Sequence, residues 1–115
     1  MGKPSHYDSP LSYELTATVA NGATDSDATD LQGHTLCGVF LASTFDGTTL
    51  GFKVSDSLAG TYVVMHDGSS DVSKTVAASR YVALNPSDFA GVRFLKFVAG
   101  SQTGATVITL ATRPV

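Results

Sequence analysis

The chain has 115 residues and a formal net charge of −3, which is the usual size of one domain and leaves no room for a second core of comparable size. Its seven lysine and arginine residues are scattered, and affinity for nucleic acid needs clustered cations that release counterions, so we expect no nucleic-acid partner. It has neither an apolar run long enough to span a bilayer nor the apolar stretch of a signal peptide, so we expect no membrane partner.

The composition favours β-structure. Aspartate is frequent, whereas Glu14 is the single glutamate of the sequence. Aspartate, glycine, serine and threonine are typical of turns and strands, while glutamate, lysine and arginine favour helices. Cys37 is the one cysteine, so it cannot form an internal disulfide, and its apolar neighbours predict a buried, inert thiol.

The first predicted elements are an arm, a strand and a loop. Residues 1–10 contain two prolines and few apolar side chains, which predicts an extended arm outside the core. Residues 11–19 alternate strictly between apolar and polar side chains, the pattern of a strand with one buried face. Residues 21–30 are polar and lack periodicity, so we predict a surface loop there.

The rest of the chain is typical of short strands joined by turns. Asn85, Pro86 and Gly91 predict one short helical turn, because asparagine suits the N-cap, proline the first helical position and glycine the exit. The other predicted strands are residues 36–42, 50–55, 61–66, 72–77, 80–84, 92–98 and 105–111.

About eight short strands without a long helix predict an all-β domain of two packed antiparallel sheets over residues 11–115. We favour a jelly-roll topology, and an immunoglobulin-like Greek key is the alternative, because strand order cannot be read from one sequence. The aromatic residues expected in the core are Tyr13, Phe40, Phe52 and either Phe94 or Phe97.

The densest group of candidate ligands is acidic. Asp25, Asp27 and Asp30 lie within six residues and could offer oxygen atoms to a hard cation such as Ca²⁺. Their spacing is not that of an EF-hand loop, which needs a glycine at its sixth position and a distant glutamate. We favour a solvated loop whose side chains bond to their own backbone, and we expect no metal and no cofactor.

The sequence shows no catalytic constellation. His6, His34 and His66 are too far apart in sequence to predict a zinc site. No strained nucleophile turn of the G-x-S-x-G type occurs. Glu14 and an aspartate could in principle form a carboxylate pair for glycoside cleavage, but Glu14 is the one glutamate and no hydrophobic pocket is visible around it in the sequence. We therefore expect no enzymatic function; the least favoured alternative is a small hydrolase that uses Glu14 or the acidic group.

Sugar binding is an open alternative. Many β-sandwich modules hold sugars on a flat aromatic platform with a few polar loop residues, but tryptophan, the best stacking residue, is absent here. Tyr7, Tyr62 and Tyr81 are the aromatic residues that we expect to face outward. A sugar-binding module for host attachment is thus one of the functions to be tested.

Two stretches carry a resemblance to a known class of protein. They are residues 44–62, TFDGTTLGFKVSDSLAGTY, and residues 81–96, YVALNPSDFAGVRFLK. They resemble small virion proteins encoded near the capsid genes of tailed phages and prophages, and the first stretch is also loosely similar to discoidin-like jelly rolls. The two stretches cover less than a third of the chain.

The resemblance implies a structural role without catalytic residues. It implies a capsid decoration or cement protein, made in the host bacterial cytoplasm, that binds the major capsid protein on the outer surface of the head. We expect a homotrimer at three-fold positions, with a tail or fibre component as the alternative. The predicted capsid contacts lie in the arm and are Lys3, Pro4, His6 and Tyr7.

Overall fold

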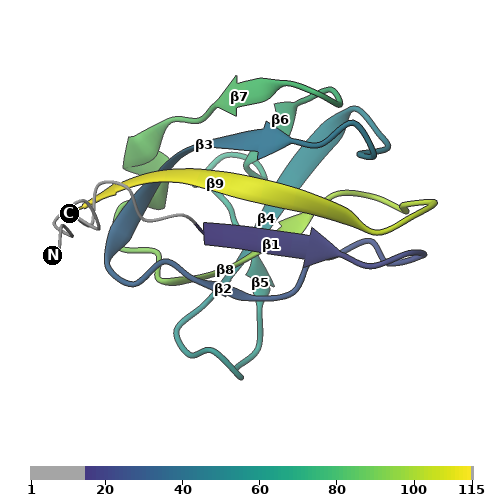
Figure 1. Ribbon diagram of the computed structural model, residues 1–115. Helices are drawn as coiled ribbons and strands as arrows, with labels where there is room; N and C mark the ends of the chain where they lie inside the picture. The colour runs from purple at the N-terminus through teal and green to yellow at the C-terminus, as the bar shows by residue number, and fades with distance from the viewer. Residues whose placement is uncertain (1–14, 115) are drawn as a thin grey trace, which may run out of the picture.

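The computed structural model describes residues 15–114. The predicted arm over residues 1–10, with Lys3, Pro4, His6 and Tyr7, lies outside the described residues, as do Tyr13 and Glu14. Within the described range nine strands and one short helical turn follow one another (Figure 1). They are β1 (Leu15–Val19), β2 (Thr29–Asp30), β3 (His34–Leu41), β4 (Thr49–Ser55), β5 (Val63–Val64), β6 (Ser73–Thr75), β7 (Tyr81–Ala83), a 3-10 turn (Pro86–Phe89), β8 (Phe94–Val98) and β9 (Thr106–Pro114).

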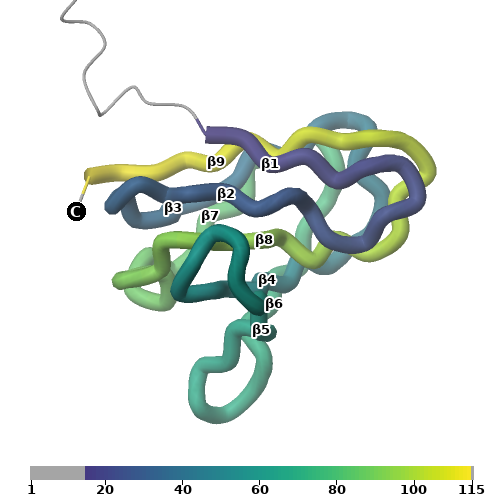
Figure 2. The backbone as a smooth tube through the Cα atoms, turned by 90° about the horizontal axis from the view of Figure 1, so that it is seen from below, coloured from purple at the N-terminus to yellow at the C-terminus, as the bar shows by residue number. Residues whose placement is uncertain are grey.

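The strands form two antiparallel sheets, which confirms the predicted all-β sandwich. The first sheet has the order β1-β9-β3-β7. The second sheet has the order β2-β8-β4-β5, and β6 also pairs with β4. The two sheets lie in separate layers (Figure 2), and their inner faces hold one cluster of buried apolar side chains.

β5 and β6 are two halves of one interrupted strand. Both pair with β4, on the side opposite β8. Lys53 pairs with Val64 and Gly51 pairs with Ser73, so two residues along β4 correspond to nine along its partner. The extra residues leave the sheet between β5 and β6 as a small hairpin that projects beyond it (Figure 2). A bridge between His66 and Asp71 closes this hairpin.

With β5 and β6 counted as one strand, the topology is a jelly roll. The chain then has eight strand positions, and it changes sheet at each connection except the one between β4 and β5. This alternation gives two four-stranded sheets built from interleaved segments, the double Greek key of a jelly roll. In the immunoglobulin-like arrangement the first two strands pair with each other, whereas β1 and β2 lie in different sheets.

The core is centred on aromatic side chains from the second sheet and the helical turn. The ring of Phe52 meets the rings of Phe89 and Phe97 edge-on, with centroids 5.0 Å and 5.8 Å apart. Phe89 reaches the core because the 3-10 turn directs it inward, and the Asn85 side chain caps that turn by accepting from the Ser87 N–H. The predicted helical turn and its cap are confirmed.

The expectation that Phe40 belongs to the core is wrong. Phe40 is 51% exposed, because β3 contains a register shift between Leu36 and Gly38. A bulge of this kind adds one residue to the strand and changes the face to which the following side chains point. Val39 therefore fills the core, and Phe40 lies on the outer face of the first sheet.

The predicted surface loop over residues 21–30 is wrong in part. Its end forms β2, and Ser26 and Thr29 are buried. The Ser26 hydroxyl accepts a hydrogen bond from the Phe97 N–H at 2.9 Å and donates to the Asp27 carbonyl at 2.8 Å. Serine and threonine hydroxyls replace the missing strand pairs here, so a polar segment can lie against the sandwich edge.

No helix among residues 15–114 has the length and apolar character needed to cross a bilayer.

Candidate functional site

The three carboxylates considered as cation ligands have different partners. Asp25 accepts from the Lys53 ammonium at 2.7 Å. Asp27 accepts from the backbone N–H of Thr18 at 2.9 Å, which ties the loop to β1. Asp30 lies in β2 of the second sheet, next to β8. Each carboxylate stabilises its own stretch of backbone or a neighbouring cation, so the three do not converge.

Asp30 forms the best-defined ion pair of the described chain. Its two carboxylate oxygens accept from Arg93 at 3.0 Å and 3.3 Å, and one oxygen also accepts from the Gln32 N–H at 2.8 Å. The bond from Arg93 lowers the pKa of Asp30, and the bond from Gln32 lowers it further. Within residues 15–114 no three histidine, cysteine, aspartate or glutamate side chains gather as metal ligands would.

The described histidines and the cysteine lie apart from one another. His34 contacts the Thr112 hydroxyl at 3.3 Å through Nδ1. His66 accepts from a backbone N–H of the hairpin through Nδ1, and His6 lies outside the described residues. Cys37 is half-buried and donates to the Thr35 carbonyl at 3.4 Å. The predicted full burial of the Cys37 thiol is therefore too strong.

The tyrosines expected to face outward do not form one platform. Tyr81 lies in β7 of the first sheet, and its ring packs against Phe40 with centroids 4.6 Å apart. Tyr62 lies beside β5 of the second sheet, where the Lys96 ammonium sits 4.7 Å from its ring centroid. Its hydroxyl donates to the Leu58 carbonyl at 2.8 Å. Tyr7 lies outside the described residues.

Among residues 15–114, the side chains at the centre of the outer face of the first sheet are uncharged. Strand pairing places Tyr81 beside Phe40, Phe40 beside Thr109, and Thr109 beside Thr16. Phe40, Tyr81 and Val107 are 51%, 48% and 44% exposed. We name this surface the threonine–aromatic face, and its residues are Thr16, Thr18, Phe40, Tyr81, Val107, Thr109 and Ala111.

Gly38 allows the Tyr81 side chain to pack closely against β3. A Cβ atom at this position would overlap the ring of Tyr81, so the ring lies directly over the glycine. An aromatic side chain that covers a strand glycine restores packing that the glycine lacks. The Tyr81 ring thus lies against Gly38 and packs against Phe40 at an interplanar angle of 50°.

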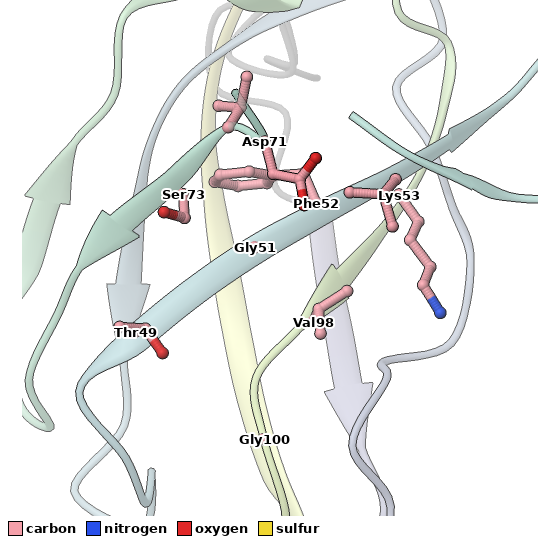
Figure 3. A pocket seen from close by; sticks show the side chains of 10 residues that line it. Thr49, Gly51, Phe52, Lys53, Asp71, Ser73, Val98 and Gly100 are labelled. Atoms are coloured by element: carbon pink, nitrogen blue, oxygen red, sulfur yellow. The ribbon is translucent and has the colours of Figure 1, made fainter. Parts of the chain in front are cut away.

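The outer face of the second sheet contains a hollow of about 480 Å³. We name it the Gly51 hollow, because the bare backbone of Gly51 lies at its floor between Val98 of β8 and Ser73 of β6 (Figure 3). Val64 closes one end of it. The break between β5 and β6 supplies the remaining wall, because the hairpin brings Asp71 to the rim.

The polar side chains at the Gly51 hollow are two hydroxyl groups and two charged groups of opposite sign. Thr49 and Ser73 provide hydroxyl groups, and Asp71 provides an exposed carboxylate. Lys53 also lines the hollow, but its ammonium pairs with Asp25 at 2.7 Å, which neutralises much of its charge. The hollow therefore combines an apolar floor with hydroxyl and carboxylate groups at its edge.

Neither the backbone nor the packing requires glycine at position 51. Its φ angle lies outside the left-handed region, and an added Cβ would meet only Val98, at ordinary van der Waals distances of 3.5 Å from its Cβ and 3.9 Å from its carbonyl oxygen. A glycine within a strand weakens it, and such a position commonly marks a close approach by a ligand or another backbone. Gly51 thus differs from Gly38, where Tyr81 occupies the space.

Gln102 is the buried polar residue that sequence reasoning missed. It is 1% exposed. Its Oε1 accepts from the Asp46 N–H at 2.8 Å, and its Nε2 donates to the Asp46 carbonyl at 2.8 Å. Asp46 in turn accepts from the backbone N–H and the hydroxyl of Thr103 at 3.0 Å and 2.7 Å. These bonds hold the loop after β3 to the loop before β9, a structural role that no motif signals.

Comparisons with protein families, with curated proteins and with solved structures give no match to this chain. The function is therefore inferred from the residues and from the two outer faces. The threonine–aromatic face and the Gly51 hollow belong to different sheets and point in opposite directions.

Proposed function

We propose that this protein is a non-enzymatic structural protein of a tailed-phage virion, which binds the outer surface of the capsid and stabilises the head. The proposal extends the resemblance of residues 44–62 and 81–96 to small virion proteins. The partner is the major capsid protein, and the bound form is a homotrimer. A stable two-sheet sandwich with a broad docking face suits such a role.

The observation that carries the proposal is the threonine–aromatic face. The centre of a protein interface is depleted in charged residues and enriched in aromatic ones, and tyrosine is a frequent hot spot. Phe40 and Tyr81 are half exposed yet packed against each other, so they present a rigid apolar surface. The net charge is −3, yet none of the described residues of this face carries a carboxylate that would repel an acidic partner.

The titratable side chains support a non-enzymatic role. Asp30 bonds to Arg93, and Asp46 bonds to Thr103. These bonds lower the pKa of both carboxyl groups, which further favours the ionised form that an aspartate already has at neutral pH. A general acid needs the opposite shift, towards neutrality. Both carboxylates therefore serve to stabilise loops.

The protein would stabilise the head mechanically, by linking capsid subunits. A trimer would present three copies of the threonine–aromatic face, and contacts to several capsid subunits add, because release requires that all of them break together. The predicted contacts Lys3, Pro4, His6 and Tyr7 would add to this surface. A chain that begins at residue 11 should stay folded and bind heads less well, and unchanged head binding would contradict that part of the proposal.

Co-expression with the major capsid protein of the phage or prophage that carries the gene tests the proposal. The wild-type chain should sediment with assembled heads on a gradient, and cryo-electron microscopy should place it on their outer surface. Exclusive attachment to tails or fibres would assign the alternative position, and absence from all particles would overturn the virion role.

Matched variants test which surface binds. Phe40→Thr and Val107→Thr place the residue type of their neighbours on the threonine–aromatic face, and each should weaken head binding by at least about tenfold if it removes a hot spot. Val63→Thr is the control, because Val63 is 57% exposed but lies in the second sheet. Equal loss in the control would show that the surface was wrongly chosen.

A further inference from the structure

The Gly51 hollow is a second surface whose form the docking role does not require. It lies on the second sheet, opposite the threonine–aromatic face. A protein bound to a capsid through the first sheet would therefore leave this hollow exposed to solvent. The two surfaces can act independently.

We propose that the Gly51 hollow binds a single pyranose ring of a glycan. Neighbouring strands lie about 4.8 Å apart, so the backbones of β8 and β6 on either side of β4 are roughly 9–10 Å apart, and the missing side chain at Gly51 leaves the space between Val98 and Ser73 open. Val98 and Val64 border the floor, and Thr49 and Ser73 lie at the edge. A pyranose chair has the matching chemistry, since one face presents C–H groups and its rim presents hydroxyls.

The charge distribution disfavours ionic ligands. Lys53 is paired with Asp25 at 2.7 Å, and Asp71 adds a negative charge at the rim, so a phosphate group would meet little net attraction. A divalent cation needs several oxygen ligands of the protein, whereas Asp71 is the one carboxylate among the residues that line the hollow. A neutral polyhydroxyl ligand meets neither obstacle.

Asp71 is the residue that would fix the orientation of the sugar. It lies at the base of the hairpin, where its backbone bridges to His66, and Figure 3 shows it on the same side of the β4 ribbon as Ser73. A carboxylate accepts strong hydrogen bonds from hydroxyl donors. Paired hydroxyls of a pyranose ring could donate to its two oxygens while the C–H face rests on Gly51.

The binding should be weak and specific for a ring. The hollow has no exposed aromatic platform, because Phe52, which lies below its floor, is 1% exposed. Without aromatic stacking, we expect a dissociation constant on the order of 1–10 mM for one sugar unit. Several copies on one particle would raise the effective affinity for a glycan-coated surface.

The test is a titration of the full-length ¹⁵N-labelled chain, followed by amide chemical shifts. The probes are methyl α-D-glucopyranoside, methyl α-D-mannopyranoside, methyl β-D-galactopyranoside and N-acetylglucosamine, each raised to tens of millimolar. At least one should give saturable shifts centred on Gly51, Ser73 and Val98. Sorbitol, which has the hydroxyls but no ring face, should not. Absence of such shifts with all four probes, or equal shifts with sorbitol, would overturn the proposal.

Two variants locate the site. Gly51→Val fills the hollow and should abolish the saturable shifts. Asp71→Ala, at an exposed position, should weaken binding by about tenfold, because a hydrogen bond to a charged group is lost; this variant decides the matter if Gly51→Val fails to fold. Val63→Thr is the control and should bind the sugar as the wild type does. Unchanged binding in the Gly51 and Asp71 variants would refute the site.

The same variants separate this inference from the proposed function. Gly51→Val should sediment with heads like the wild type, because position 51 lies on the second sheet. Phe40→Thr should bind the sugar normally while it loses head binding. Loss of sugar binding without loss of head binding supports two independent surfaces, and a chain that binds sugar but no virion particle would defeat the docking role alone.

Discussion

Two glycines in the middle of strands should respond to alanine in opposite directions. Gly38 lies in β3 under the ring of Tyr81, and a methyl group there would overlap that ring. Gly51 lies in β4, and a methyl group there would meet Val98 at ordinary contact distance. Neither residue has a positive φ angle, so the difference comes from packing alone.

The magnitudes follow from simple contributions. Gly51→Ala should stabilise the fold by about 0.5–1 kcal/mol, because the unfolded chain loses conformational freedom. Gly38→Ala gains the same amount but displaces the ring of Tyr81. That displacement removes the contact between the rings of Tyr81 and Phe40, which contributes about 0.5–1.5 kcal/mol. It also exposes the apolar surface of β3 that the Tyr81 ring covers, which costs roughly 1–2 kcal/mol. The net expectation for Gly38→Ala is a loss of about 0.5–3 kcal/mol.

Unfolding in guanidinium chloride measures both effects. The midpoint should rise for Gly51→Ala and fall for Gly38→Ala, with the slope unchanged in each case. A double-mutant cycle isolates the cause, because Gly38→Ala in a Tyr81→Ala background should no longer destabilise the protein. The reasoning is refuted if Gly51→Ala destabilises the fold, or if Gly38→Ala remains as harmful when the Tyr81 ring is absent.

Three further predictions concern the loops and the ion pairs. Gln102→Leu should lower the free energy of unfolding by about 1–3 kcal/mol in the same assay, because the part-buried N–H and carbonyl of Asp46 lose their partner. The bond from the Thr103 side chain lowers the pKa of Asp46, so its stabilisation holds above the unfolded pKa of about 3.9 and is lost as the pH falls below it. Asp46→Asn should therefore flatten the loss of stability between about pH 5 and pH 2, measured by thermal unfolding, and an unchanged slope would contradict this. Lys53→Met, which breaks a half-exposed pair with Asp25, should change stability by less than about 1 kcal/mol, and a larger loss would mean that the pair is a structural element.

Most of the fold could be predicted from the alternation of apolar and polar side chains. Period-two patterns predicted β4 and the described part of the first strand, because a half-buried strand needs one apolar face. Asn85 and Pro86 predicted the 3-10 turn by local capping chemistry, which does not depend on the rest of the fold. The all-β sandwich followed from strand length and spacing, whereas the strand order that distinguishes the jelly roll from the immunoglobulin-like alternative came only from the pairing in the structure.

The errors arose where tertiary structure overrides the local pattern. β2 is only two residues long, too short for any periodicity, and it forms because β8 offers a free edge. The exposure of Phe40 depends on the bulge at Cys37, and a bulge leaves no mark in a run of apolar residues. The burial of Gln102 depends on a loop more than fifty residues away in sequence, so its surroundings gave no signal.

The Gly51 hollow could not be predicted for a related reason. The sequence indicated two separate strands over residues 61–66 and 72–77, whereas the structure places β5 and β6 on the same edge of β4. The hollow exists because the intervening hairpin leaves the sheet beside Gly51. A glycine in an alternating strand looks like a weak strand residue in the sequence, and only the pairing on both of its sides turns it into the floor of a hollow.

The same geometry explains how one small sandwich could hold two roles without conflict. Side chains of a strand point alternately inward and outward, and the two sheets share their inward side chains in one core. The outward side chains of the two sheets are therefore separated by that core and can change independently, provided that the strands keep their pairing. A substitution at Gly51 alters a cavity that the core does not need, while a substitution at Gly38 disturbs the packing of a ring. For this reason the sign of the change in the free energy of unfolding on substitution by alanine distinguishes the two positions. A loss indicates a glycine that the fold requires, as at Gly38, and a gain indicates a glycine whose space is left to a ligand, as at Gly51.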